Sequence, residues 1–409
     1  MLQLPTKIAE SIIDYIDDDR SSLLSCSMIA SSWRVRSLAH LFRILQVTQS
    51  PDSFDRWWSS STAPPVAFVR VTIEEFARLM SEFAPLVRFV VHLQIGDWMD
   101  VGAHDDPFTA FLAHLHLPAG NSVERLSLFG HFSVRPEHLR RNFGNVTVIR
   151  THSRQYTSLR SFAACLEALS TLTFVEVTGN EFRRSRARPA RSLSPSGVVL
   201  RPNFSAGCCV TLKMDTNSRI LPGILRWVSL DPSSFASVAL VGFIPSYENG
   251  QLTDKPLGHL LDDPTSPILR TIRSLDVGFE EVMLSAFTRL VNHLPMVNSV
   301  CCTVAFQNLW PTTLSRAFAR ELWTPTLRRL EIVTEHDFTN PLLMHKTWEA
   351  LSLALRDPKW RDLDVFVLRL KWRQTVPLFV QEPIQRKLDN LFRDSKVSVF
   401  LEGKRATLG

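Results

Sequence analysis

Short runs of alternating apolar and polar residues recur along the chain from Val91 onward. Successive side chains of a strand point to opposite faces, so this alternation is typical of strands with one buried face. We predict such strands at residues 91–95, 123–128, 146–148, 174–177, 210–214, 238–240, 272–277, 300–304, 327–332 and 363–367.

Segments with helical spacing separate several of these strands. Apolar residues recur there at intervals of three and four, which places them on one face of a helix. Repetition of strand and helix is typical of a solenoid, although the strand spacing here is irregular and reaches beyond the roughly 20–29 residues of a leucine-rich repeat. A generic α/β domain with alternating elements is the alternative. The predicted helices are residues 74–83, 158–169, 280–294 and 347–355.

The start of the chain has a purely helical pattern. Ile8, Ile12 and Ile16 recur every four residues and form one apolar stripe along a helix. After an acidic break, Ser21 and Ser22 offer hydroxyl groups that can cap a second helix. A unit this small cannot bury every apolar side chain that it carries, so some of them need a partner. Further apolar residues at helical spacing are Leu23, Leu24, Met28, Ile29, Trp33, Leu38, Leu41, Phe42 and Leu45.

The same residues carry a specific motif. In order, the motif comprises Leu4-Pro5, Ile12-Ile13-Asp14, Asp18-Asp19, Leu23-Leu24-Ser25-Cys26-Ser27, Trp33 and Leu41-Phe42-Arg43. This order and spacing resemble an F-box, most closely the version common in mushroom-type fungi. The chain departs from that version at Ile29-Ala30, where many relatives have Val-Cys.

The resemblance implies that the segment docks onto a Skp-family adaptor and, through it, onto a cullin–RING ubiquitin ligase. It also fits a leucine-rich-repeat region behind the F-box, as relatives with this N-terminus often have. An ordinary N-terminal helical cap on a solenoid is the alternative. The docking surface that the resemblance assigns consists of Leu4, Pro5, Ile8, Ile12, Leu24, Ile29 and Trp33.

We therefore expect an α+β chain with a small three-helix F-box at residues 1–47, a turn-rich linker at 48–70, and an irregular leucine-rich-repeat-like α/β solenoid, a horseshoe, at 71–409. The segment 181–205 interrupts the solenoid, because clustered arginines are followed there by Ser, Pro and Gly. We interpret it as a basic surface insertion between repeats. A nuclear-localisation or acidic-partner patch is the other interpretation.

Composition and charge reduce the number of functions that the protein can have. The chain has 46 Lys and Arg against 40 Asp and Glu, a mild surplus that argues against a dedicated nucleic-acid-binding protein. Its hydrophobic content of 45% supports a large core. The six cysteines form no C-x-x-C pair, which is typical of reduced thiols in a cytoplasmic or nuclear protein. We find no signal peptide and no apolar stretch of membrane-spanning length, so we expect no membrane partner.

Catalytic motifs are missing from the sequence. It has no G-x-S-x-G elbow and no glycine-rich phosphate loop. His114 and His116 stand two apart, but no third ligand at metal-binding spacing supports a zinc site. The sequence therefore predicts a protein that is not an enzyme and that needs no metal or cofactor.

Two classes of binding protein remain. In the first, the F-box binds the adaptor and the solenoid binds a substrate protein for ubiquitin transfer. In the second, the solenoid is an interaction scaffold without a ligase, and the arginine-rich segment 181–205 would direct it to the nucleus. In either class, residues just after the strands are candidates for recognition, since they gather at one edge of a solenoid, with core packing as the alternative role for each. The candidates for substrate binding are Trp98, His131, Phe132, Asn180, Phe243, Phe279, His336 and Trp372.

Overall fold

The computed structural model describes residues 6–16, 19–49, 69–96, 107–130, 132–152, 155–156, 158–178, 181–182, 210–215, 221–231, 234–244, 267–270, 272–280, 284–305, 324–336, 349, 352–372, 382, 385–386, 389–390 and 397–402. The chain divides into two compact units, Met1–Val210 and Thr211–Gly409.

Three helices open the first unit: α1 (Thr6–Tyr15), α2 (Arg20–Ile29) and α3 (Ser31–Leu41). They surround a small core of their own, because each contributes at least one side chain that is almost completely buried. Partly buried apolar residues complete this core at its rim. The buried residues are Ile13, Leu23, Cys26 and Leu41, and those at the rim are Ile16, Trp33, Leu38 and Phe42.

The start of α2 differs from our expectation that serine hydroxyls would cap it. Asp19 is the N-cap residue, and its carboxylate accepts hydrogen bonds from the backbone N–H groups of Ser21 at 3.0 Å and Ser22 at 3.2 Å. Both hydroxyl groups also donate to this carboxylate. These hydrogen bonds, that of the Ser22 side chain foremost, lower the pKa of Asp19 to about 2. A carboxylate just before the first turn satisfies two unpaired backbone donors at once, and it therefore replaces the hydroxyl groups as the cap.

The sheet of the first unit is entirely parallel. Its strand order is β2-β1-β3-β4-β5-β7. The strands are β1 (Ile44–Thr48), β2 (Val69–Thr72), β3 (His92–Ile95), β4 (Arg125–Phe129), β5 (Val148–His152) and β7 (Phe174–Thr178). A separate parallel pair is formed by β6 (Gln155–Tyr156) and β8 (Glu181–Phe182).

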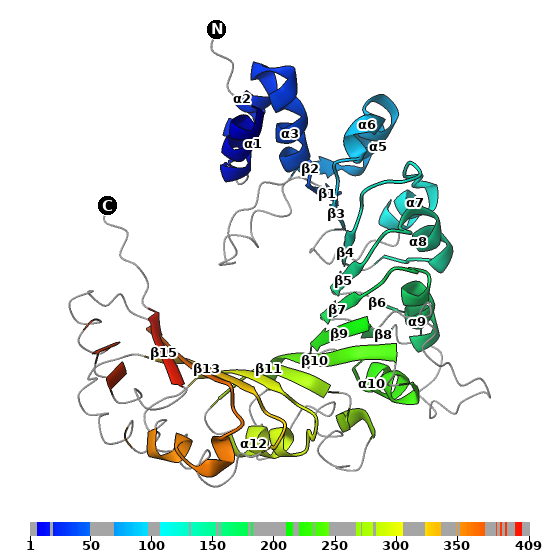
Figure 1. Ribbon diagram of the computed structural model, residues 1–409. Helices are drawn as coiled ribbons and strands as arrows, with labels where there is room; N and C mark the ends of the chain where they lie inside the picture. The colour runs from blue at the N-terminus through cyan, green and yellow to red at the C-terminus, as the bar shows by residue number, and fades with distance from the viewer. Residues whose placement is uncertain are drawn as a thin grey trace. The chain divides into compact units, whose positions relative to one another are not determined.

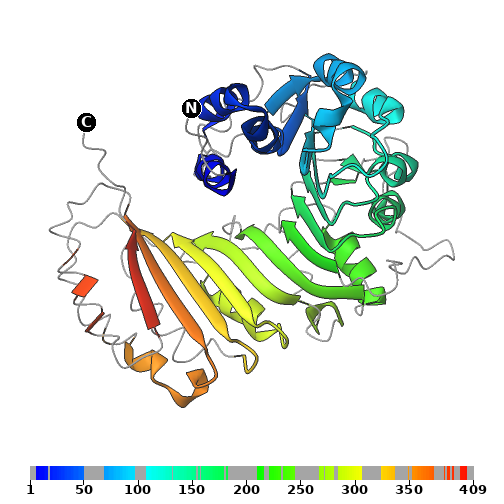
Figure 2. The same ribbon diagram turned by 45° about the horizontal axis from the view of Figure 1, so that its top comes forward.

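The helices that follow these strands lie on one face of the sheet, as Figures 1 and 2 show. Thr72 marks one strand-to-helix junction, because it ends β2 and also forms a capping box with Glu75 at the start of the next helix. The opposite face carries none of these helices. The helices are α5 (Ile73–Glu82), α6 (Ala84–Val87), α7 (Pro107–His114), α8 (Pro136–Asn142) and α9 (Leu159–Glu167).

Strand register builds the core of the first unit in rows. One row contains Leu45, Leu93, Leu126, Ile149 and Val175, which pair across neighbouring strands and are all almost completely buried. Since side chains alternate along a strand, the next row on this face lies two residues further on. It contains Val47, Ile95, Leu128, Thr151 and Val177, which are also buried.

A repeated backbone hydrogen bond fixes this register. The backbone oxygen of Arg43 accepts from the N–H groups of two consecutive residues in the next repeat, Val91 at 3.0 Å and His92 at 2.9 Å. The backbone oxygen of Val91 accepts from Glu124 and Arg125 in the same way. The pattern continues at Glu124 and Thr147, and in the second unit at Arg273, Asn298 and Arg328; at Arg273 only one donor is present among the described residues.

The second unit repeats the same principle. Its strands follow the order β9-β10-β11-β12-β13-β14-β15, and the pairs from β10 to β15 are parallel. A buried row contains Leu240, Leu275, Val300, Leu330 and Phe366. The elements are β9 (Val210–Asp215), α10 (Leu221–Leu230), β10 (Phe235–Ile244), η3 (Pro267–Arg270), β11 (Ile272–Glu280), α12 (Leu284–Asn292), β12 (Ser299–Ala305), β13 (Arg329–His336), η7 (Pro358–Trp360), β14 (Val365–Trp372) and β15 (Val397–Glu402).

Each unit therefore has the topology of a leucine-rich-repeat-like α/β solenoid, since its strands are parallel and in chain order except at β1 and β2. Two predicted boundaries differ from the structure. Residue 47, the predicted end of the helical segment, lies inside β1, and β2 begins at Val69 within the predicted linker 48–70. Leu41 and Leu45 stand four apart, which imitates a helix, whereas Leu45 and Val47 alternate as a strand does. Residues 183–205 of the predicted insertion lie outside the described residues.

We predict that Gly96→Ala strongly destabilises the first unit. Gly96 follows β3 with φ of 113°, a conformation that L side chains rarely adopt. An added Cβ would also lie 2.0 Å from the backbone oxygen of Phe129, which the flexibility of a side chain cannot relieve. Urea unfolding followed by circular dichroism should show a loss of at least ~2 kcal/mol.

Two other glycines provide controls for this experiment. Gly120 has φ of 73° but no atom within 4 Å of an added Cβ, so Gly120→Ala should lose only ~1 kcal/mol. Gly144 has equally open space and no positive φ, so Gly144→Ala should be close to neutral. Equal unfolding midpoints for Gly96→Ala and Gly120→Ala would contradict the steric explanation.

Candidate functional site

Helices α1–α3 carry an exposed apolar surface. More than half of the large apolar side chains that are exposed within the described ranges lie on these helices, and the others are scattered along the chain. A scattered exposed apolar residue is ordinary, whereas a concentration on one small unit indicates an interaction site. We call this set the apolar helix surface. It consists of Ile8, Ile12, Tyr15, Leu24, Met28, Ile29 and Val35.

The two sides of α1 explain how this surface arises. Ala9 and Ile13 face inward and are almost completely buried. Ile8, Ile12 and Tyr15 recur at intervals of four and three, so they form a second apolar stripe on the same helix. This second stripe is exposed, with Ile8 at 49% and Tyr15 at 87%. The core of the three helices therefore does not need the outer stripe.

Asp14 connects the two ends of this small unit. Its carboxylate accepts two hydrogen bonds from the Arg36 guanidinium, both at 2.7 Å, and lies 2.8 Å from Nε2 of His40. The hydrogen bonds from Arg36, and then that from His40, lower the pKa of Asp14 to about 2. Because Asp14 lies on α1 and its partners lie on α3, the ion pair holds the first helix against the third.

The residues that the resemblance assigns to adaptor docking occupy different positions. Ile8, Ile12, Leu24 and Ile29 belong to the apolar helix surface. Trp33 is only partly buried and packs against the core of the three helices. Leu4 and Pro5 lie outside the described residues.

Among the eight residues proposed for substrate binding, the structure describes the side chain of Phe132 alone. Phe132 is buried and its ring packs against Phe108, with centroids 5.3 Å apart, so it has the alternative role of core packing and not that of recognition. A ring that follows a strand can turn back into the space between strand and helix, and Phe132 does so. Trp98, His131 and Asn180 lie outside the described residues.

Four other candidates lie within strands instead of after them. The strands of the second unit are longer than the alternating pattern indicated, so they include these positions. Phe243 is in β10, Phe279 in β11, His336 in β13 and Trp372 in β14.

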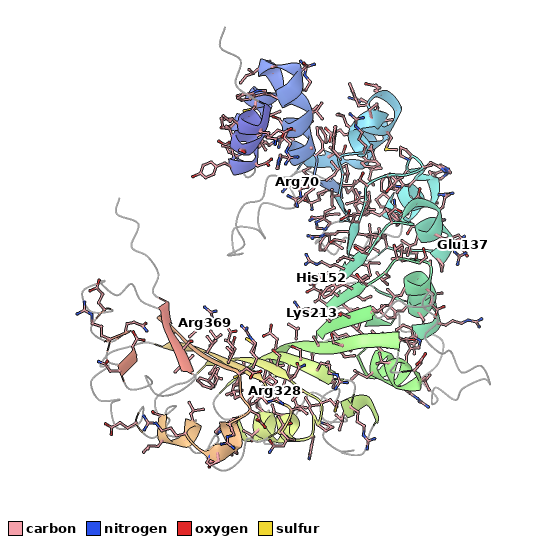
Figure 3. All side chains as sticks on the ribbon, viewed as in Figure 1. Arg70, Glu137, His152, Lys213, Arg328 and Arg369 are labelled. Atoms are coloured by element: carbon pink, nitrogen blue, oxygen red, sulfur yellow. The ribbon has the colours of Figure 1, made fainter. Side chains whose placement is uncertain are left out.

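The helix-free face of the first sheet was missed as a candidate. We define it by the strand residues that alternate with the apolar rows; one row of them pairs across the whole sheet, and Gln46 and Ser127 in that row are themselves buried. Figure 3 shows Arg70 and His152 on this side of the strands, whereas Glu137 lies on α8 on the other side. The polar residues between the apolar positions of each strand were the signal that could have revealed it. The row contains Arg70, Gln46, Gln94, Ser127, Arg150 and Glu176.

The pKa of a buried histidine, His92, depends on the charges of this face. Nε2 of His92 lies 2.8 Å from the hydroxyl of Ser127, and its ring is mostly buried. Burial, and then the positive charges of Arg150 and Arg125, lower the pKa of His92 to about 4. The ring is therefore neutral at pH 7, and the charge on this face comes from the arginines.

The corresponding face of the second unit holds a charge cluster around Glu331. Its carboxylate accepts from Arg369 at 2.6 Å and from Arg329 at 2.9 Å. Burial raises the pKa of Glu331, but the hydrogen bonds from Arg369 and Arg329 outweigh it, so the pKa is lowered. Burial and the nearby carboxylates of Asp276 and Glu331 raise the pKa of Cys301 to about 12. This thiol is therefore protonated at pH 7 and is a poor nucleophile.

Two further properties concern the described part of the chain. It contains no group of three or more His, Cys, Asp or Glu side chains that could hold a metal ion. Its helices are all too short or too polar to cross a membrane.

Comparisons with known proteins add little to this picture. No protein-family model matches the chain, and no curated protein matches it. Among solved structures, an internalin (inlF) from Listeria monocytogenes str. 4b F2365 aligns with 97% of this chain and 95% of its own, at 10% identity and a TM-score of 0.24. So low a TM-score supports no conclusion, and the class of leucine-rich-repeat-like α/β solenoids is assigned from the sheet topology alone.

We predict that Asp14→Asn loosens the three-helix unit. The lowered pKa means that the ionised carboxylate stabilises the folded state above about pH 4, and that this contribution is lost as the pH falls toward about 2. The side chains of Asp14 and Arg36 are both more than one-third exposed, so solvent screening reduces the effect at pH 7 to ~1 kcal/mol or less.

Urea unfolding at pH 7 and pH 2, followed by circular dichroism, measures this difference. Asp14→Asn should be less stable than the natural chain at pH 7 and nearly equal to it at pH 2. Glu124→Gln, at an exposed position, should behave like the natural chain at both pH values. A difference of the same size at both pH values would exclude the ion pair as its cause.

Proposed function

We propose that this protein is the substrate-recognition subunit of an SCF-type (Skp–cullin–F-box) ubiquitin ligase. In this proposal, α1–α3 bind a Skp-family adaptor, which connects the chain to a cullin, and the solenoid binds a substrate protein. The observation that carries the proposal is the apolar helix surface, because it stands on a unit that already has a complete core.

The F-box-like motif supports this assignment through the division of its residues. Ile13, Leu23 and Cys26 are motif residues that form the internal core. Ile12 and Leu24 are their immediate neighbours in the motif, yet they are exposed. A motif that alternates between inner and outer positions in this way provides both a stable fold and a surface for a partner.

The solenoid supports the other half of the proposal. Stacked strands present an extended sheet face whose side chains can change without loss of the buried rows. Such a surface suits a receptor that selects a protein substrate. Transfer of ubiquitin would then be carried out by the other subunits of the ligase, since a receptor of this kind contributes binding and orientation.

A scaffold without a ligase is the competing function. It shares the solenoid but gives the apolar helix surface no adaptor to bind. Binding of the full-length chain to a purified Skp-family adaptor therefore separates the two functions directly.

We predict that the triple variant Ile8→Ala, Leu24→Ala and Ile29→Ala loses adaptor binding. Complete burial of an aliphatic side chain contributes ~1.5–3 kcal/mol, and these three are already partly covered, so each should contribute ~1 kcal/mol. The dissociation constant, measured by isothermal titration calorimetry, should rise by about two to three orders of magnitude.

Leu353→Ala provides a matched control, since Leu353 is 66% exposed and lies in the second unit. This variant should bind the adaptor as the natural chain does. The triple variant should also keep the natural melting temperature, because the core of the three helices is unchanged. The proposal fails if the natural chain does not bind the adaptor, or if the triple variant binds it with unchanged affinity.

A further inference from the structure

The helix-free face of the first sheet is rich in arginine. Arg70, Arg125 and Arg150 belong to strands β2, β4 and β5, and Glu176 in β7 is the only carboxylate at the described positions of this face. Its histidines do not change the sign, because His92 is neutral at pH 7 and a histidine side chain can add only positive charge. The face therefore carries a net positive charge.

The arginines differ in whether their guanidinium groups already pair with a carboxylate. Nε of Arg150 lies 2.9 Å from Oε2 of Glu176, so this guanidinium is partly neutralised, although its side chain is 52% exposed. The side chain of Arg125 is exposed and has no hydrogen bond or ion pair with any residue that the structure describes. Arg125 thus offers a guanidinium with free donors.

Apolar side chains stand next to these charges. Arg125 pairs with Val148, and Val148 pairs with Phe174, so the three residues form one row across β4, β5 and β7. Val148 and Phe174 are only partly buried. Neighbouring strands are about 4.8 Å apart, so a partner that crosses them meets an arginine and an apolar side chain within a few ångströms.

This combination favours one kind of partner. A carboxylate of the partner can form a bidentate hydrogen bond with a guanidinium. An apolar side chain next to that carboxylate in the partner can then cover Val148 or Phe174. A nucleic acid would instead place a continuous line of phosphates against the face, where Glu176 repels them and the apolar residues gain nothing. The mild net charge of the chain, six positive charges, points in the same direction.

We infer that the helix-free face of the first sheet binds an extended protein segment in which acidic residues stand next to apolar ones, with Arg125 and Arg150 as its principal contacts. This segment belongs to the substrate if the proposed receptor function holds. Binding of the segment itself does not require the adaptor.

The test uses the full-length chain and fluorescence anisotropy of a labelled peptide in which Glu alternates with Leu. The same peptide with Gln in place of Glu, and a single-stranded DNA of similar length, serve as comparison ligands. The acidic peptide should bind most tightly, and raising NaCl from about 0.05 M to 0.3 M should weaken it several-fold, because the contacts are exposed.

Charge variants then locate the contact. The double variant Arg125→Glu and Arg150→Glu should weaken binding of the acidic peptide at least about tenfold. Glu176→Gln should strengthen it, since it frees Arg150. Arg140→Glu is the matched control, because Arg140 is exposed on α8, on the opposite side of the same sheet, and it should leave binding unchanged.

Equal binding of the Glu and Gln peptides would overturn the inference, and so would unchanged binding by the double variant. Tighter binding of the DNA than of the acidic peptide would overturn it as well. Adaptor binding by the double variant should equal that of the natural chain, since the apolar helix surface is untouched. A failure of this inference can therefore be told apart from a failure of the proposed ligase function.

Discussion

The structure depends on a contact that recurs at the entry of several strands, where one backbone carbonyl accepts hydrogen bonds from two consecutive N–H groups of the next repeat. Arg43, Val91 and Glu124 supply the first three of these acceptors in the first unit, and Asn298 and Arg328 do so in the second. Because a shift of one residue would turn every side chain to the other face, this contact decides which residues are buried. It also satisfies backbone donors that would otherwise lose their hydrogen bonds on burial.

Both candidate surfaces follow from a clean separation of inner and outer side chains. In the sheet, the carbonyl contacts keep Leu126 and Leu128 toward the helices, and Arg125 consequently faces the other way. In the helical unit, the compact core and the Asp14 ion pair hold α1–α3 together. The outer apolar stripe of α1 is therefore not needed for the packing of these helices. The two surfaces therefore differ in chemistry, the first basic and polar, the second almost wholly apolar.

Local periodicity predicted most strands because residues such as Leu126 and Leu128 alternate with polar neighbours. It missed β1, whose Leu45 continues the four-residue spacing of the preceding helix. It left the role of Phe132 open between recognition and core packing, since the sequence does not show that Phe108 lies close enough to pack against it. The helix-free face was missed for a similar reason. Arg150 and Glu176 are far apart in the sequence and become neighbours only because β5 pairs with β7. The sequence alone does not show that these two strands pair.

Because of the carbonyl contact, the helical side of the solenoid can change during evolution independently of the opposite face. It fixes where these strands begin but sets no limit on the length of chain between one acceptor and the next. These intervals vary, and the one from Val91 to Glu124 is longer than the one from Glu124 to Thr147. Insertions can therefore accumulate on the helical side without moving a residue of the opposite face. For protein engineering, the same property makes the connections suitable places for tags or reporter domains, while the sheet face can be redesigned one residue at a time.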